Sequence, residues 1–130
     1  MKLQKLCYYA QAWSLVWDEA PLFSEKFQAW ANGPVCPKLY QAHRKSFLLS
    51  KNAHLGGDPA KLVGAAKETV DAIIKSYGPK SAHYLSELTH AEKPWREARG
   101  STPPGVASKA EITHPAMAEY YEGLLAKRPR

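Results

Sequence analysis

The stretch FQAWANGPVCPKLY, residues 27–40, decides the fold more than any other part of the chain. Gly33 can adopt a positive φ, Pro34 restricts φ to about −65°, and Pro37 suits the first turn of a helix. The chain is therefore predicted to turn sharply after Trp30 and to begin a helix near Pro37. The stretch holds no evident catalytic group, which favours a binding role over chemistry.

Length and composition indicate one globular domain. A chain of 130 residues buries roughly two-thirds of its unfolded surface on folding. We expect a single domain over residues 1–126 and a basic tail at 127–130. No apolar run approaches the roughly 18 residues of a membrane span. The two cysteines fit a reducing cytoplasm better than a disulfide framework.

The formal net charge of +6 indicates a basic surface, which attracts either nucleic acid or an acidic protein. One basic group, Arg44 and Lys45, follows the start of the helix expected at Pro37. Two interpretations stay open for this group: a solvated face, or a patch that binds an acidic partner or DNA. The corner near Trp30 does not fit a helix-turn-helix, because it is too long and rich in proline.

Apolar spacing predicts a mainly α domain, a compact set of about five to six helices with a small β element near residues 22–35. The first helix is apolar on nearly every face, which places it in the middle of the domain. The helices are expected at residues 2–19, 37–47, 60–77, 81–90, 94–99 and 114–127.

Single residues predict how several of these helices begin and end. Ser81 and Thr113 can accept hydrogen bonds from the first turns of the helices that follow them. Gly78, which precedes Pro79, is expected to end its helix in the left-handed conformation. Residues 52–59 are rich in helix breakers and are expected to form a mobile loop.

Three blocks of sequence resemble the Panacea antitoxin domain family, also called SocA-like. The first block is LQKLCYYAQAW at residues 3–13, and the second lies within residues 21–40. The third comprises LSELTH at residues 85–90, followed by Pro94 and Trp95. A lone Gly-Pro-Val would mean little, whereas three blocks in the family's order and spacing are a specific signal.

This resemblance implies a small cytoplasmic protein of a prokaryote or a phage, encoded beside a toxin that it neutralises by direct binding. One branch of the family acts as an adaptor that presents its toxin to a cytoplasmic protease such as ClpXP. A DNA-binding regulator of a phage or toxin–antitoxin operon is the alternative, because of the basic charge. The positions that match the family motif are expected to be structural: Leu6, Trp13, Trp30, Gly33, Pro34, Pro37, Tyr40, Leu85, Thr89, His90, Pro94 and Trp95.

Members of this family usually carry a further helix ahead of the first block, whereas this chain begins at that block. We therefore expect an uncovered apolar patch around Tyr8, Trp13 and Trp17, which would dock on a partner or on a second copy. The candidate partner-binding residues are side chains expected to be exposed: Tyr8, Trp17, Arg44, Lys45, Phe47 and Tyr121.

Two motif regions allow more than one interpretation. The corner at residues 30–34 is either a structural lock or a display of aromatic surface to the toxin, and backbone shape favours the lock. His90 either marks a site or stands at a helix C-terminus, bonded to a terminal carbonyl, with Trp95 packed beneath. Tyr40 is expected to be a hydrogen-bonded core residue.

We expect no enzyme activity and no cofactor or metal. Cys7, Cys36 and the five histidines lack the short spacings of zinc ligands. No sequence feature places Cys36 beside His90 as a nucleophile and its base. The acidic residues form no paired-carboxylate arrangement of the kind that hydrolases use.

Overall fold

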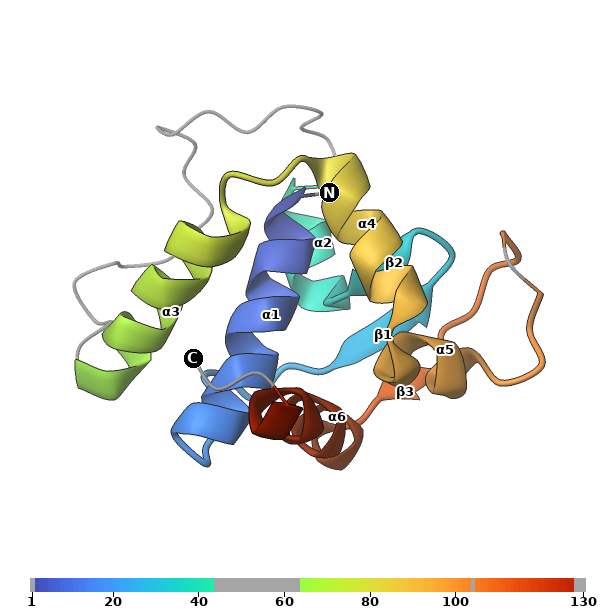
Figure 1. The fold of residues 1–130 in the computed structure, drawn as a ribbon. Coiled ribbons are helices and arrows are strands. Elements are labelled where there is room, and N and C mark those ends of the chain that lie inside the picture. The colour runs from blue at the N-terminus through green and yellow to red at the C-terminus, as the bar shows by residue number, and fades with distance from the viewer. Residues whose placement is uncertain (1, 44–63, 104, 128–130) are drawn as a thin grey trace.

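Helix α1, Lys2–Trp17, runs through the middle of the protein (Figure 1). The computed structural model describes residues 2–43, 64–103 and 105–127. Helices α3, α4 and α6 and strand β2 all pack against α1. Tyr8, Tyr9 and Ala12 are each at most 1% exposed. A helix that is apolar on nearly every face needs neighbours on several sides. The structure provides these neighbours, so the predicted central position of α1 is confirmed.

A small antiparallel sheet lies beside α1, with the strand order β2-β1-β3. Strands β1, Phe27–Trp30, and β2, Gly33–Val35, form a hairpin. Strand β3, Glu111–Ile112, pairs with the other edge of β1. The β element predicted near residues 22–35 is confirmed. The third strand was not predicted, because two residues are too few to show an alternating pattern.

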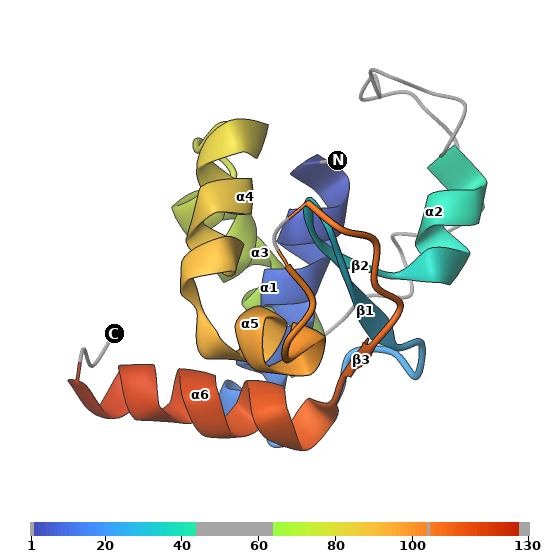
Figure 2. The same cartoon turned by 90° about the vertical axis from the view of Figure 1, so that its right-hand side faces the viewer.

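Five further helices surround α1 and the sheet within the described ranges. They are α2, Pro37–His43; α3, Gly64–Tyr77; α4, Ala82–Ala91; α5, Lys93–Arg99; and α6, His114–Lys127. Helix α3 lies on one side of α1, whereas α4, α5 and the sheet lie on the other (Figure 1). Helix α6 crosses the end of α1 and also contacts α5 (Figure 2). The predicted mainly α class is confirmed.

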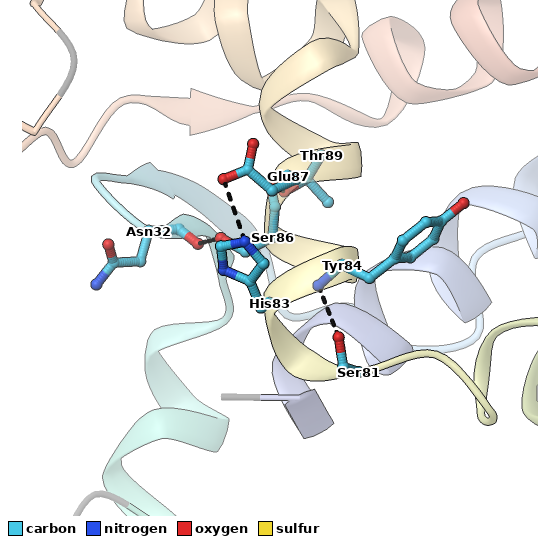
Figure 3. A network of polar contacts seen from close by, with 7 residues as sticks. All are labelled: Asn32, Ser81, His83, Tyr84, Ser86, Glu87 and Thr89. Atoms are coloured by element: carbon cyan, nitrogen blue, oxygen red, sulfur yellow. Dashed lines mark hydrogen bonds and ion pairs between the residues drawn. The ribbon is translucent and has the colours of Figure 1, made fainter.

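Both predicted N-caps are present. Ser81 Oγ accepts a hydrogen bond from the Tyr84 amide at 3.0 Å, at the start of α4 (Figure 3). Thr113 Oγ1 accepts one from the Ala116 amide at 3.2 Å, at the start of α6. These oxygens satisfy amides that have no acceptor within the helix, so each short polar side chain sets where its helix begins.

Gly78 follows the end of α3, but the left-handed conformation predicted for it is wrong, because its φ is not positive. Its amide still donates to the Ile74 carbonyl at 2.9 Å, as in a continuing helix. A Cβ at Gly78 would lie 2.2 Å from that carbonyl oxygen. Glycine therefore serves here for close backbone approach and not for a positive φ.

The uncovered apolar patch predicted on α1 is wrong at Tyr8 and Trp13, which are 1% and 9% exposed. Tyr121 of α6 covers both, with ring centroids 6.2 Å and 5.5 Å away. On the other side, Trp13 Nε1 donates to the Tyr77 hydroxyl of α3 at 3.1 Å. The chain's own later helices supply the cover. No helix within the described ranges combines the length and apolarity needed to cross a membrane.

Several predictions fall outside the residues that the structure describes. They concern Arg44, Lys45 and Phe47 as partner-binding residues, the loop at 52–59, the outer parts of two helices at 44–47 and 60–63, and residues 128–130 of the tail.

Candidate functional site

The turn between β1 and β2 depends on Gly33, whose φ of 120° is a conformation that other residues rarely adopt. A Cβ at this position would also lie 2.7 Å from Lys5 Cε and 3.1 Å from Thr89 Oγ1. The backbone angle and the close approach of α1 and α4 therefore both require glycine.

Side chains of α4 and α5 hold the backbone of β1 and its turn. Each donates to a different carbonyl oxygen: Ser86 Oγ to Asn32 at 2.8 Å (Figure 3), Trp95 Nε1 to Trp30 at 2.8 Å, and Arg99 Nη1 to Ala29 at 2.9 Å. These bonds tie the two helices to the backbone of the corner at three points. This arrangement favours the structural interpretation of the corner at residues 30–34 over a display of aromatic surface.

Arg99 also ties the loop before β3 to the same corner. Its Nη2 donates to the Pro103 carbonyl at 2.9 Å and to the Val106 carbonyl. Its guanidinium carbon lies 4.9 Å from the centre of the Trp95 ring. Arg99 is only 5% exposed, so these carbonyls and the ring replace the water that its charge has lost.

Lys5 is a buried cation beside the corner, 1% exposed, at the point where α1 passes Gly33. Its Nζ has no hydrogen-bond partner among the described residues. Burial lowers the pKa of Lys5 to about 8, because the charged ammonium loses its hydration.

His90 lies in the last turn of α4 and stacks on Trp95, with ring centroids 4.1 Å apart and 18° between the planes. Burial lowers the pKa of His90. Its Nε2 is buried and has no partner in the part of the chain that the structure describes. The stacking agrees with the expectation that Trp95 packs beneath a histidine at a helix end.

Glu92 is a buried carboxylate, 6% exposed, between α4 and α5. The hydroxyls of Tyr9 and Tyr121 donate to its Oε1 at 2.7 Å and 2.8 Å, and the Tyr8 hydroxyl lies 3.2 Å from that of Tyr121. Burial raises the pKa of Glu92, and the two donors oppose that rise. The expectation that Tyr8 and Tyr121 are exposed anchors is wrong, because both belong to this buried cluster.

Two glutamines on α1 make structural contacts that sequence reasoning missed. Gln4 Oε1 accepts from the Cys36 amide at 2.9 Å, at the end of the corner. Gln11 Oε1 accepts from the Leu22 amide at 2.7 Å, and its Nε2 donates to the Phe23 carbonyl at 2.9 Å. Both glutamines stand on an otherwise apolar helix, and a buried side-chain amide must find hydrogen-bond partners. This pattern in the sequence could have indicated their structural role.

The motif positions all lie in or against the core. Seven are buried: Trp13, Gly33, Pro34, Leu85, Thr89, Pro94 and Trp95. Five are half-buried: Leu6, Trp30, Pro37, Tyr40 and His90. Tyr40 meets Trp30 edge to face, with centroids 4.9 Å apart. Trp17, a candidate partner-binding residue, is half-buried and stacks on Trp13 at 5.1 Å.

The described residues include no group of three or more histidine, cysteine, aspartate or glutamate side chains placed to hold a metal ion. Burial, reinforced by the nearby Cys36, raises the pKa of the Cys7 thiol to about 11. A thiol in that environment stays protonated at neutral pH, and the thiolate is the reactive form of cysteine.

A surface hollow of about 780 Å³ lies along α5, where α4 ends. Its wall includes the stacked rings of His90 and Trp95, the cations Lys93, Arg96 and Arg99, and the carboxylate of Glu97. Lys93 and Arg96 are exposed and form no ion pair with any described residue. Trp95 therefore belongs to two regions: its Nε1 donates a hydrogen bond to the corner, and the residue also lines the hollow.

A family model for the antitoxin SocA-like, Panacea domain matches residues 3–96. The match begins in α1, includes the whole corner and ends within α5, after Trp95. The chain belongs to this family of antitoxin-like domains. No curated protein and no solved structure matches it.

Proposed function

We propose that this chain is an antitoxin that neutralises a cognate toxin by direct protein–protein contact. Membership of the SocA-like antitoxin family over residues 3–96 is the observation that carries the proposal. The match includes α1, the corner and α4, so a large part of the fold supports the assignment and not one short motif.

The proposed mechanism is occlusion of the toxin's active site or substrate path, which needs no reaction on this chain. Its polar interior supports a scaffold role: Glu92 is bound by two tyrosine hydroxyls, Arg99 by three carbonyls, and the Cys7 thiol is kept protonated by its raised pKa. An interface of roughly 800 Å² on each partner, with a few well-packed anchors, gives a stable complex.

The proposal includes two fates for the bound toxin. Occlusion leaves the toxin intact in a stable complex, whereas an adaptor delivers it to a cytoplasmic protease such as ClpXP. The half-life of the toxin in cells with and without that protease separates the two routes. A half-life that lengthens only in protease-deficient cells assigns the adaptor route.

The test is co-purification from the native cell with a tag on this chain, followed by mass spectrometry and by co-expression of each recovered protein. We expect a stoichiometric small protein that stops growth when expressed alone and is tolerated when this chain is co-expressed. Recovery of no such protein contradicts the proposal. Recovery of DNA that is lost as salt rises indicates nonspecific attraction to the +6 charge, whereas salt-resistant binding to one sequence would favour the regulator alternative.

A further inference from the structure

The hollow along α5 holds charge that the fold does not use. Lys93 and Arg96 stand three residues apart on α5, so they project from one helix face about 5–6 Å from each other at Cβ. Both are exposed and neither pairs with an acidic side chain among the described residues. Arg99 is already occupied by carbonyl oxygens. The hollow therefore has two cations available to a ligand.

Two stacked rings line the same hollow as these cations. His90 stacks on Trp95 at 4.1 Å, and Trp95 is fixed by its hydrogen bond to the Trp30 carbonyl. A pre-formed pair of rings reduces the entropy lost on binding, because these two side chains need little reordering, although Lys93 and Arg96 must still be ordered. Two cations beside these rings, unpaired among the described residues, suit a compact anionic group.

The available charges favour the carboxylates of a protein over the backbone of a nucleic acid. A nucleic acid needs a stripe of cations that follows its phosphates. Among the described residues, Lys93 and Arg96 share one short helix with Glu97 beside them. The other exposed cations that have no ion pair within the described ranges are scattered over separate segments and form no continuous stripe with these two: Lys38, Lys75, Lys80 and Lys109. Lys75 lies on α3, across α1 from α5 (Figure 1). Lys67 of the same helix is already paired with Asp71 at 2.8 Å. A short acidic segment matches this limited patch.

We propose that the hollow along α5 receives an acidic segment of the toxin, whose carboxylates pair with Lys93 and Arg96 above the His90–Trp95 stack. This inference rests on the proposed function, because it names the chemistry of the toxin surface that the antitoxin recognises. It places the contact on α5, away from the tyrosines that the sequence suggested.

His90 makes this contact depend on pH. Burial lowers its pKa; Glu87 opposes that effect, Lys5 and Arg99 add to it, and a backbone hydrogen bond with Asn32 opposes it again. An anion in the hollow favours the charged imidazolium, so binding takes up a proton. Because the pKa of free His90 lies below its ordinary value of 6.5, affinity for an acidic segment rises as pH falls toward and below 6.5, where glutamate side chains remain ionised.

The direct test titrates the full chain with hexaglutamate and follows the His90 ring and the Trp95 indole by NMR. We expect both signals to shift with one saturating curve that tightens at lower pH and weakens with salt. The double variant Lys93→Gln with Arg96→Gln should lose about tenfold in affinity, because two exposed charge pairs are removed. The matched control, Lys38→Gln with Lys75→Gln, removes the same charge from two exposed lysines that have no ion pair among the described residues, and it should change affinity less than about twofold.

A single variant isolates the proton-linked part. His90→Gln should keep binding at pH 8 and lose the gain at pH 6, provided that its melting curve shows it folded. A pH dependence that survives this change would overturn the role of His90.

Three outcomes overturn the docking inference itself. One is a flat titration, and another is equal weakening by the control variant. The third is tighter binding of a single-stranded oligonucleotide than of hexaglutamate, followed at the same two NMR signals.

Once the toxin is recovered, the Lys93 and Arg96 variant should also capture it more weakly. Normal capture would overturn this inference and leave the antitoxin proposal intact. Failure to find any toxin counts against the antitoxin proposal, while the titration still decides what the hollow binds.

Discussion

The corner and the hollow share Trp95, and they differ in how their polar groups are satisfied. In the corner, carbonyls of Ala29, Trp30 and Asn32 each accept a hydrogen bond from a helix side chain. In the hollow, Lys93 and Arg96 have no ionic partner among the described residues. Satisfied and buried groups specify a fold, whereas exposed and unpaired charges are available to a partner. The difference separates scaffold from recognition surface within one short stretch of chain.

The largest expected effect comes from Trp95→Ala. The change truncates a 7% exposed indole and leaves the Trp30 carbonyl without its donor, so we expect a loss of about 3–5 kcal/mol in the free energy of unfolding. Denaturant unfolding measures it. Tyr84→Ala, an aromatic side chain that is 48% exposed on α4, is the control and should change stability by less than about 0.5 kcal/mol. Lost toxin binding with unchanged stability would mean that Trp95 serves the recognition surface alone and does not stabilise the corner.

Lys5→Met is expected to stabilise the protein at pH 7, by about 3 kcal/mol. The folded-state pKa of Lys5 is depressed from 10.5 to about 8, so its neutral form contributes stability that is present above pH 10.5 and is lost as pH falls to about 8. Methionine has similar length and no charge to desolvate. Melting curves of both proteins from pH 7 to pH 10.5 test this, because the advantage of methionine should shrink as pH rises above about 8. If Lys5→Met is less stable than the unchanged protein at every pH, the prediction is wrong and the Lys5 ammonium has a stabilising partner in solution.

Gly33→Ala is expected to lose about 2 kcal/mol, because φ of 120° strains any residue with a Cβ and the new methyl would press on the Lys5 stem. Gly123 in α6 provides a control of opposite sign. A Cβ there meets nothing within 4 Å, and alanine favours a helix interior. Gly123→Ala should therefore gain about 0.5–1 kcal/mol. Equal effects of the two substitutions would contradict the special geometry of the corner.

The smallest stability effect belongs to the hollow. Lys93→Gln with Arg96→Gln should change the free energy of unfolding by less than about 0.5 kcal/mol, because both side chains are exposed and unpaired in the fold. Thermal melting checks this before any binding measurement. A loss comparable with that of Gly33→Ala would erase the contrast between the two regions.

Local patterns predicted the elements well. Ser81, Thr113 and Pro94 each mark a helix start that the structure confirms, because a cap or an N-terminal proline acts within its own first turn. The error at Gly78 also concerns a few neighbouring residues. The pattern indicated a glycine at a helix end, but it could not show whether glycine is needed there for a positive φ or for the close approach of the Ile74 carbonyl. Strand β3 was missed because pairing with β1, not its own two residues, makes it a strand.

Which aromatic residues were exposed could not be predicted from spacing. Tyr8 and Tyr121 are 113 positions apart, and their hydroxyls meet at 3.2 Å beside Glu92 only after α6 has packed across α1. Tyrosine suits both cores and interfaces, because it joins a large apolar ring to one polar group. Whether a tyrosine is buried therefore depends on the residue that covers its ring, and that residue comes from a distant segment of the chain.

The sequence by itself determined the helical class and the corner at Gly33, because backbone restrictions and apolar periodicity act over a few residues. The resemblance of three sequence blocks indicated the family, which the match over residues 3–96 shows. Only the tertiary structure decided which polar groups found partners. It placed Arg99 on three carbonyls and Glu92 beneath two tyrosines, and it left Lys93 and Arg96 unpaired within the described residues. Hydrogen bonds and ion pairs extend only a few ångströms, so they depend on which distant segments the fold brings together.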